Sequence, residues 1–222
     1  MFITLEGPEG SGKSSQLPLL QDYLLDKGYS VYSTREPGGT SIGDQIRDVL
    51  LDNQNVAMHP RTEILLFQAS RAQLVEQVIL PRIKRGEIVL CDRYADSTIA
   101  YQGYGHQVNL EKLSAIIDFA TGGLKPDLTF LLDIDVRLGL LRRKKEGDIN
   151  RLDQLVIEFH QRVRQGYHQL VKSEPDRWEL IDAGQSFDHV QSEMRQILLK
   201  RLETWKKPII GNNNSSVQQN NS

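Results

Sequence analysis

The sequence predicts a single α/β domain built on a five-stranded parallel sheet that is flanked by helices. Short apolar runs at residues 2–6, 30–35, 87–92, 127–133 and 178–182 have the length of strands, and the segments between them are long enough for helices. Strands that alternate with helices form crossover units and pair in parallel. The chain has 222 residues, of which 39% are hydrophobic and 25% charged, and this suits one globular domain.

The helical patterns fix the expected limits of this domain. Residues 154–171 and 187–205 are predicted helices, and so is 62–84, where Pro81 falls late and could kink the helix. The 62–84 helix has a broad apolar stripe, which predicts core, with a subunit interface as the alternative. The stripe consists of Leu65, Leu66, Ala69, Ala72, Val75, Val78 and Ile79. We expect residues 1–205 to form the domain and 206–222, which is almost wholly polar from Gly211 onward, to be a disordered tail.

Composition excludes several classes of function. A formal net charge of −2 argues against a nucleic-acid-binding protein, which would show a basic excess. No apolar run approaches the ~20 residues that span a bilayer, and no secretory signal pattern is recognised, so we expect no membrane partner. The single cysteine, Cys91, lies in an apolar run and is expected to be buried. One cysteine cannot form an intrachain disulfide, which fits a cytoplasmic protein.

The most informative motif follows the first predicted strand. Residues 7–14 read Gly-Pro-Glu-Gly-Ser-Gly-Lys-Ser and fit the phosphate-binding loop (P-loop) pattern between a strand and a helix. Its glycines let backbone N–H groups surround a phosphate, Lys13 is expected to reach the β- and γ-phosphates, and the Ser14 hydroxyl is expected to bind Mg²⁺. The predicted ATP-binding residues are Gly7, Pro8, Glu9, Gly10, Ser11, Gly12, Lys13, Ser14 and Ser15.

Acidic and basic residues gather where the other predicted strands end. Asp92 closes the third strand, where an acid supports the Mg²⁺ ion in P-loop enzymes, and Arg93 follows it. Arginine suits bidentate phosphate contacts, and Arg35, Arg47 and Arg71 recur at strand ends and on neighbouring helices. The basic run 142–145 with Arg151 is predicted to form a lid, at about residues 139–153, that closes over phosphates; the alternative is a solvated helix face.

These features favour a nucleotide kinase over other P-loop proteins. A switch GTPase would carry a guanine-reading Asn-Lys-x-Asp sequence, which is absent. The recurring arginines and the basic run favour a nucleotide kinase over a motor ATPase. A P-loop switch or ATP-sensing module without transfer activity remains the alternative from another class. Within the kinases, an enzyme that acts on another nucleoside monophosphate or on a deoxynucleoside remains the alternative.

The chain resembles the thymidylate kinase family from Phe2 to about Trp205. Five segments support the resemblance: the P-loop with Glu9 inside it, Arg-Glu-Pro-Gly-Gly-Thr at 35–40, Leu66-Phe67 with Arg71, the 92–102 block, and Pro-Asp-Leu-Thr at 126–129 running into Leu132-Asp133. The 92–102 block contains Asp92-Arg93-Tyr94, Ser97-Thr98 and Tyr101-Gln102. The 35–40 string and the 92–102 block are specific to the family.

The resemblance implies a P-loop kinase fold with a short basic lid and the reaction ATP + dTMP → ADP + dTDP with Mg²⁺ in a homodimer. Phe67, which could otherwise be plain core, resembles the ring that stacks on thymine, and Arg71 the arginine that bonds the base carbonyl. Thr98 and Gln102 match positions at the base edge, and Tyr101 matches the residue that disfavours ribose. Arg47 and Arg93 match the arginines of the acceptor phosphate, and Glu9 the acid of the 3′-hydroxyl. The predicted substrate-binding residues are Glu9, Glu36, Pro37, Arg47, Phe67, Arg71, Arg93, Ser97, Thr98, Tyr101 and Gln102.

The chain departs from the family in its lid and its P-loop. The family often has a further arginine where this chain has Glu146, and some members carry a P-loop arginine where it has Gly10. We therefore expect the lid to supply the catalytic cation. The predicted catalytic residues are Lys13, Arg93, Arg142 and Arg151, and the predicted metal-supporting residues are Ser14 and Asp92.

Overall fold

The computed structural model describes residues 1–147 and 149–205 and confirms the predicted parallel sheet. Its strands are β1 (Phe2–Glu6), β2 (Val31–Arg35), β3 (Ile88–Asp92), β4 (Leu128–Asp133) and β5 (Trp178–Asp182). Their order across the sheet is β2-β3-β1-β4-β5, and all four pairings are parallel. The predicted strands agree with these bounds to within one residue.

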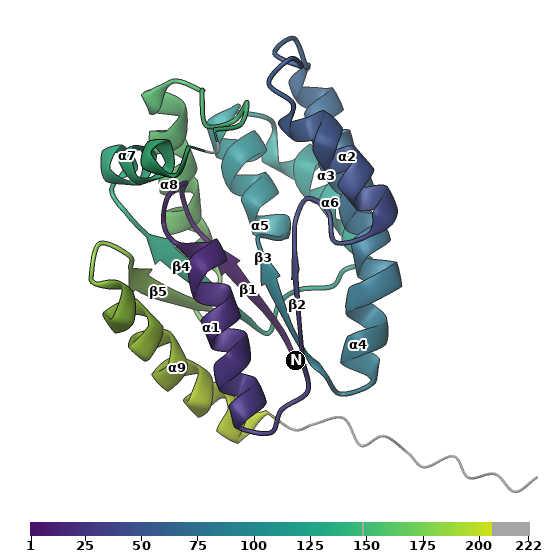
Figure 1. Cartoon of the computed structure of the whole chain (residues 1–222). Helices are drawn as coiled ribbons and strands as arrows, with labels where there is room; N and C mark the ends of the chain where they lie inside the picture. The colour runs from purple at the N-terminus through teal and green to yellow at the C-terminus, as the bar shows by residue number, and fades with distance from the viewer. Residues whose placement is uncertain (148, 206–222) are drawn as a thin grey trace, which may run out of the picture.

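Helices cover both faces of the sheet (Figure 1). One face packs on α1 (Lys13–Asp26) and α9 (Phe187–Thr204), where alternate strand residues such as Ile3, Leu5 and Leu90 meet Leu20 and Met194. The other face packs on two groups of helical residues. The first belongs to α3 (Pro60–Leu74), η1 (Val75–Ile79) and α4 (Leu80–Lys84), and the second to η2 (Ile99–Gly105) and α8 (Ile157–Ser173). The elements α2 (Ser41–Leu51), α5 (Ala95–Thr98), α6 (Leu110–Thr121) and α7 (Val136–Glu146) complete the described fold.

The segment predicted as one helix at 62–84 is helical throughout but changes its winding. It begins at Pro60 and passes through five residues of π-helix, Val75–Ile79, before Pro81. A proline in a helix lacks an N–H donor, and its ring crowds the carbonyl four residues back. The wider π-helical turn before Pro81 gives this ring more room.

The apolar stripe on this segment is only partly core. Val75 and Ile79 are fully buried, whereas Leu65 is 59% exposed. The prediction that the whole stripe is core was therefore wrong for Leu65 and Ala69, which are both exposed. The reason is that α3 packs on α2 and α6 at its edges and presents the side of Leu65 to solvent.

The parallel sheet brings all five strand ends to the same edge of the domain. Asp92 is in register with Leu5 of β1 and with Arg35 of β2, and Glu6 is in register with Leu131 of β4. Loops that leave this edge carry the residues singled out from the sequence, as expected for open α/β sheets. The fold thus gathers the P-loop, Asp92 and Arg93 in one place.

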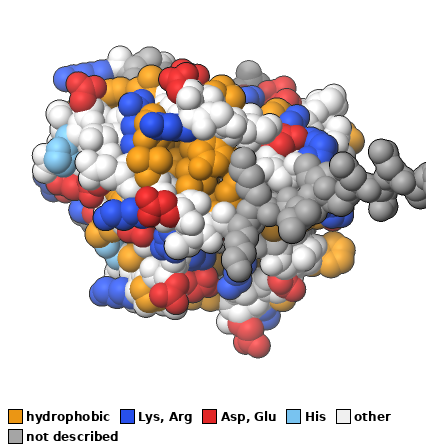
Figure 2. Space-filling view, turned by 90° about the horizontal axis from the view of Figure 1, so that it is seen from below, with side chains coloured by type: hydrophobic (Ala, Val, Ile, Leu, Met, Phe, Trp, Pro, Cys, Tyr) orange, Lys and Arg blue, Asp and Glu red, His pale blue; other side chains and the backbone are white. Residues whose placement is uncertain are grey.

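The face opposite this edge has a mixed surface. Seen from below, hydrophobic side chains gather near its middle, with side chains of both charges around them (Figure 2). Among the described residues, no helix is long and apolar enough to cross a membrane. Cys91 is fully buried, as predicted. The tail predicted at 206–222 lies outside the described residues.

Candidate active site

A cavity of about 320 Å³ lies at the carboxyl edge of the sheet. All of the predicted substrate-binding residues line it, together with Ser14, Ser15 and Asp92. Its charged lining is dominated by arginine and lysine: Lys13, Arg35, Arg47, Arg71, Arg93 and Arg143 face three carboxylates, those of Glu9, Glu36 and Asp92. Such an excess of cations suits a ligand with several negative charges.

The P-loop wraps around the side chain of its own lysine. Gly7, Gly10 and Gly12 have φ angles of 144°, 67° and 87°, in the region that side-chain-bearing residues avoid. The loop curls so that Lys13 Nζ donates to Gly7 O at 3.0 Å, to Pro8 O at 2.9 Å and to Ser11 Oγ at 3.0 Å. Burial, assisted by Arg93, lowers the pKa of Lys13 to about 8 despite nearby carboxylates. With these three hydrogen bonds, all three protons of the charged ammonium group have an oxygen acceptor in the loop.

Ser14 and Asp92 form the second feature of the phosphate end. Ser14 Oγ donates to Asp92 Oδ2 at 2.6 Å, and both residues line the cavity. Within the described residues no group of three or more His, Cys, Asp or Glu side chains could hold a metal by itself. A hydroxyl and one carboxylate fit Mg²⁺ in the manner of nucleotide enzymes, where phosphate oxygens and water complete the octahedron.

Arg93 occupies the centre of the site because of an unusual backbone. Directly after β3 its φ is 68°, which turns the side chain away from the strand direction and into the cavity. Its guanidinium donates to Glu9 Oε1 at 2.8 Å, to Gly7 O at 3.0 Å, and to the Ser97 and Tyr167 hydroxyls at 3.3 Å. Burial alone would raise the pKa of Glu9, but Arg93 and Lys13 outweigh it and lower that pKa to about 2.

A buried carboxylate that the sequence reasoning missed lies behind Arg93. Glu6 accepts hydrogen bonds from Tyr94 N at 2.7 Å, Ser97 Oγ at 2.6 Å and Tyr167 Oη at 2.9 Å. Burial and the charge of Asp96 raise the pKa of Glu6 to about 7. Its position as an acid ending β1 is the same signal that marked Asp92 at the end of β3.

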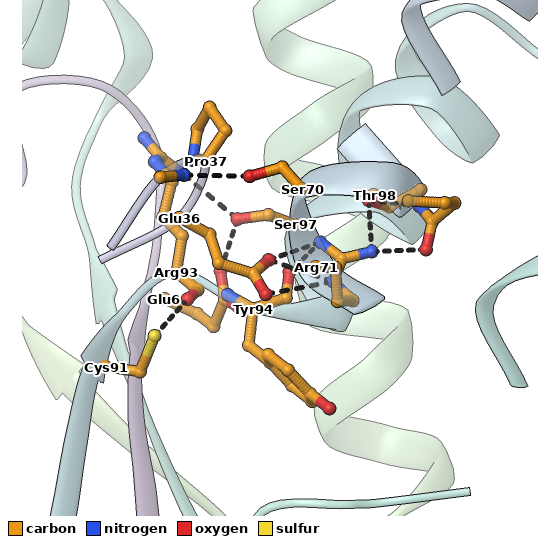
Figure 3. A network of polar contacts seen from close by, with 12 residues as sticks. Glu6, Glu36, Pro37, Ser70, Arg71, Cys91, Arg93, Tyr94, Ser97 and Thr98 are labelled. Atoms are coloured by element: carbon orange, nitrogen blue, oxygen red, sulfur yellow. Dashed lines mark hydrogen bonds and ion pairs between the residues drawn. The ribbon is translucent and has the colours of Figure 1, made fainter. Parts of the chain in front are cut away.

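Arg71 is the most fully occupied cation of the site (Figure 3). It is 1% exposed, and its Nε and one NH₂ group bind Glu36 with a shortest distance of 2.6 Å. The remaining donors reach Tyr94 O at 3.1 Å, Thr98 Oγ1 at 3.0 Å and Gln68 Oε1 at 2.8 Å. All five N–H donors of the guanidinium thus have a protein acceptor, so a ligand would have to share or replace one of these bonds.

Four side chains shape the cavity on the side of Arg71. Phe67 lies one helical turn before Arg71 and is half-buried, which leaves part of its ring for a ligand. Thr98 Oγ1 accepts from both Arg71 and Gln68, so its hydroxyl proton is left to donate. Gln102 Nε2 donates to Glu63 at 2.8 Å, and Tyr101 Oη donates to Glu9 at 2.7 Å. The polar groups at this end are therefore oriented by protein partners.

The lid residues are arranged differently from the sequence prediction. Arg142 donates to Ala183 O at 2.9 Å, and Arg151 is buried and paired with Glu63, so neither of these candidates lines the cavity. Arg143 lines it instead, and it also reaches Asp153 at 3.2 Å. Neighbouring helix residues point about 100° apart, so only one of Arg142 and Arg143 can face the site.

The lid helix α7 touches the P-loop through two glycines. A Cβ at Gly10 would lie 2.0 Å from Gly139 O, and a Cβ at Gly139 would lie 2.3 Å from Glu9 O. This close contact leaves no room for a side chain at Gly10. It explains structurally why the P-loop of this chain carries no arginine next to Glu9.

The P-loop on a five-stranded parallel sheet, with arginines facing it across one cavity, defines a phosphotransferase that acts on a phosphorylated acceptor. The comparisons with known proteins narrow this class. A family model described as thymidylate kinase matches residues 5–194. The chain belongs to the thymidylate kinase family.

Individual relatives agree with this assignment. The chain is 48% identical to a thymidylate kinase of Herpetosiphon aurantiacus, over 93% of this chain and 98% of the relative. It is 50% identical to one from an Exiguobacterium species, over 91% and 96% of the two chains. The crystal structure of thymidylate kinase from Ehrlichia chaffeensis superposes with a TM-score of 0.72 at 34% identity, covering 89% of this chain and 98% of that chain. The resemblance predicted from sequence motifs is confirmed.

Proposed function

We propose that this enzyme transfers the γ-phosphoryl group of ATP to dTMP, giving ADP and dTDP. The observation that supports this most directly is that one cavity is lined both by the P-loop residues Lys13 and Ser14 and by Phe67 and Arg71 at its other end. A phosphate donor and a planar base can therefore occupy the two ends at once. The alternative, a kinase of another monophosphate or a deoxynucleoside, is not favoured by the family.

The proposed mechanism depends on positioning and charge. The acceptor phosphate has a second pKa of about 6, so it is already a nucleophilic anion at neutral pH and needs no general base. The difficulty is repulsion: two unit charges about 4 Å apart repel by about 4 kcal/mol at an effective dielectric constant of 20. Lys13 on the donor side and Arg47 and Arg93 on the acceptor side offset that repulsion. The phosphoryl group then passes in line between the two nucleotides.

The thymidine part of the substrate would be recognised by shape and hydrogen bonds. Phe67 stacks on the base, while the Thr98 hydroxyl and the Gln102 amide face its edge. Arg71 bonds a base carbonyl by sharing a donor that now serves Thr98 or Gln68. Tyr101 crowds the 2′ position and so disfavours a ribose.

Magnesium and the lid complete the proposal. Ser14 and Asp92 would hold Mg²⁺ together with the ATP phosphates, and the ion would neutralise phosphate charge. We propose Arg143 as the lid cation of the transferred phosphoryl group because it lines the cavity. Arg142 and Arg151 then anchor the lid, through Ala183 O and Glu63 respectively.

An ADP-release assay with and without dTMP tests the function directly. Rapid release only when dTMP is present is the expected result, and slow release that ignores dTMP would instead identify an ATP-sensing module. We expect dTMP to exceed dUMP only modestly, because a buried methyl group contributes on the order of 1 kcal/mol. UMP should be a poor substrate because of Tyr101, and equal turnover of UMP and dTMP would refute the assignment.

We also propose that the enzyme is a homodimer in the cytoplasm. The exposed side of α3 at Leu65 and the exposed Ile42 and Val49 of the adjoining α2 support a subunit interface there. Sedimentation of the wild-type chain and of Leu65→Asp tests this, since the variant should shift from dimer to monomer. The cytoplasmic location is supported by the single buried cysteine, Cys91.

A further inference from the structure

A buried carboxylate outside the cavity lining connects the base-reading side chains with the lid. Glu63 lies in the first turn of α3 and is 1% exposed. Its Oε1 accepts from Gln102 Nε2 at 2.8 Å and lies 3.4 Å from His106 Nε2, and its Oε2 accepts from Arg151 at 2.5 Å. Burial alone would raise the pKa of Glu63, but these three partners lower it to about 2. Glu63 is therefore an ionised acceptor at neutral pH.

This carboxylate fixes which end of the Gln102 amide faces the cavity. An ionised carboxylate only accepts hydrogen bonds, so the amide must present its NH₂ group to Glu63. Gln102 is 1% exposed and lines the cavity, so its other end, the carbonyl oxygen Oε1, is the end left for a ligand. The cavity therefore offers an acceptor at Gln102, beside a hydroxyl at Thr98 whose proton is left to donate.

An acceptor beside a donor matches one class of pyrimidine. Thymine and uracil carry an N3–H donor next to the O4 acceptor, whereas cytosine carries an N3 acceptor next to an amino donor. A buried polar group that meets the wrong partner is left unpaired, and sites built on such groups discriminate strongly. The orientation of one amide can thus decide between the two classes of base.

The second oxygen of Glu63 extends this control to the lid. Arg151 binds Oε2 and also donates from Nε to Leu50 O at 3.3 Å. Its neighbours Asn150 and Leu152 both line the cavity. The same carboxylate therefore holds the base-reading amide on one oxygen and the lid edge of the cavity on the other.

We infer that Glu63 is a positioning residue that orients the Gln102 amide so that its oxygen accepts the N3–H of a keto pyrimidine. Through its ion pair with Arg151, the same carboxylate also holds the lid residues that line the cavity. The inference rests on the proposed function and adds the residue that determines selectivity against cytosine nucleotides. The spacing of Glu63, Phe67 and Arg71 at intervals of four residues on α3 places all three on one face of the helix.

The substitution Glu63→Gln tests this because it should turn the Gln102 amide around and lower the preference for dTMP over dCMP. Arg151 can only donate, so the oxygen of the new amide faces Arg151 and its NH₂ group faces Gln102. The Gln102 amide then rotates to bring Oε1 toward this NH₂ group, and its own NH₂ group faces the cavity. We expect the ratio of kcat/KM for dTMP to that for dCMP to fall about tenfold or more. The KM for ATP should change little, and isothermal titration with each nucleotide should show a similar fall in the ratio of the affinity for dTMP to that for dCMP.

Three further variants keep the test decisive. Arg151→Gln leaves the carboxylate in place, so it should lower kcat but keep the preference for dTMP. Because Glu63→Gln leaves Arg151 buried without its counter-charge, the double variant Glu63→Gln with Arg151→Gln removes both charges and provides a folded comparison. The two new amides can pair in either orientation, so the selectivity of the double variant should lie between that of Arg151→Gln and that of Glu63→Gln. Glu87→Gln, which removes an ion pair with Arg82 and Arg85 away from the cavity, is the matched control and should keep wild-type selectivity.

The outcomes distinguish a failure of the proposed function from a failure of the role assigned to Glu63. If the wild-type enzyme does not phosphorylate dTMP, the proposed function fails whatever the variants do. If the wild type prefers dTMP over dCMP and both variants that carry Glu63→Gln keep that preference unchanged, Glu63 is only a counter-charge for Arg151 and the inference is overturned.

Discussion

The pKa of Lys13 makes ATP binding a proton-linked reaction. Burial and the nearby Arg93 lower this pKa from the ordinary 10.5 to about 8. The triphosphate of ATP would replace the uncharged loop oxygens around Nζ by anionic ones and bring the pKa back toward its ordinary value. The bound enzyme then holds the proton more tightly than the unbound enzyme, so binding takes up a proton. The affinity for ATP should therefore fall as the pH rises through 8.

The size of the effect follows from the two pKa values. At pH 8 about half of the unbound enzyme has a neutral Lys13, so binding should take up about 0.5 proton per ATP. At pH 7 the uptake should be near ~0.1 proton and at pH 9 near ~0.9 proton. Between pH 7 and pH 9 the dissociation constant should rise about tenfold, which corresponds to about 1.4 kcal/mol.

Isothermal titration calorimetry in buffers of different ionisation enthalpy measures this uptake. ATP itself is fully ionised above pH 8, so its own protonation does not contribute there. The control is Lys13→Met, which should bind ATP weakly and without proton uptake while keeping its far-UV circular dichroism. Zero uptake by the wild-type enzyme at pH 8 would show that Lys13 stays fully charged in the unbound loop, and the reasoning from burial would be refuted.

Three further predictions concern the lid, the P-loop contact and acid stability. Arg143→Ala should lower kcat by ~10³ with little change in dTMP affinity, and Arg142→Ala should lower kcat much less, as single-turnover kinetics would show. Gly139→Ala, whose Cβ would lie 2.3 Å from Glu9 O, should raise the KM for ATP and lower the unfolding free energy by about 1–3 kcal/mol. The stability that Glu9 contributes is fully present above its unfolded pKa of 4.5 and is lost as the pH falls toward 2. Urea unfolding of the wild type should therefore show a loss of roughly 3 kcal/mol in unfolding free energy over this pH range, and Glu9→Gln should lack this loss.

A specific result would contradict each of these three predictions. Near-normal kcat in Arg143→Ala would move the catalytic cation to another residue. Unchanged kinetics in Gly139→Ala would mean that α7 can move off the P-loop at no cost. An acid-unfolding profile of Glu9→Gln that is identical to the wild type would show that the carboxyl titrates normally.

The fold could be predicted from the sequence because β1, β3 and β4 are short apolar runs and all five strands end in a charged residue. The ends of the strands at Glu6, Asp92 and Asp133 set the edge at which the site forms, and local chemistry sufficed to find it. The P-loop and the 92–102 block were equally local signals. For the same reason the residues expected to bind dTMP lie around one cavity.

The lid arrangement depended on packing that the sequence does not reveal. Arg142 and Arg143 are adjacent and chemically alike, and the phase of α7 decides which of them faces the cavity. α7 is positioned by contacts between residues far apart in the chain, such as the close approach of Gly139 to Glu9 O and the bond from Arg142 to Ala183 O. The roles of Arg151 and Glu63 were hidden in the same way, because they are 88 positions apart and meet only through the tertiary fold.

The arrangement of the cations argues for a substrate that arrives with its own charge. Lys13 is held by three loop oxygens and Arg93 by Glu9 and neighbouring oxygens, so each cation is ordered by the chain itself. A ligand can displace the uncharged partners of these cations only if it is a stronger acceptor, and a phosphate dianion is stronger than a carbonyl or hydroxyl oxygen. Binding is then an exchange of acceptors around side chains that are already in place, which keeps the entropic cost low. A deoxynucleoside brings no such acceptor to Arg93, and this physical difference favours a monophosphate as the phosphoryl acceptor.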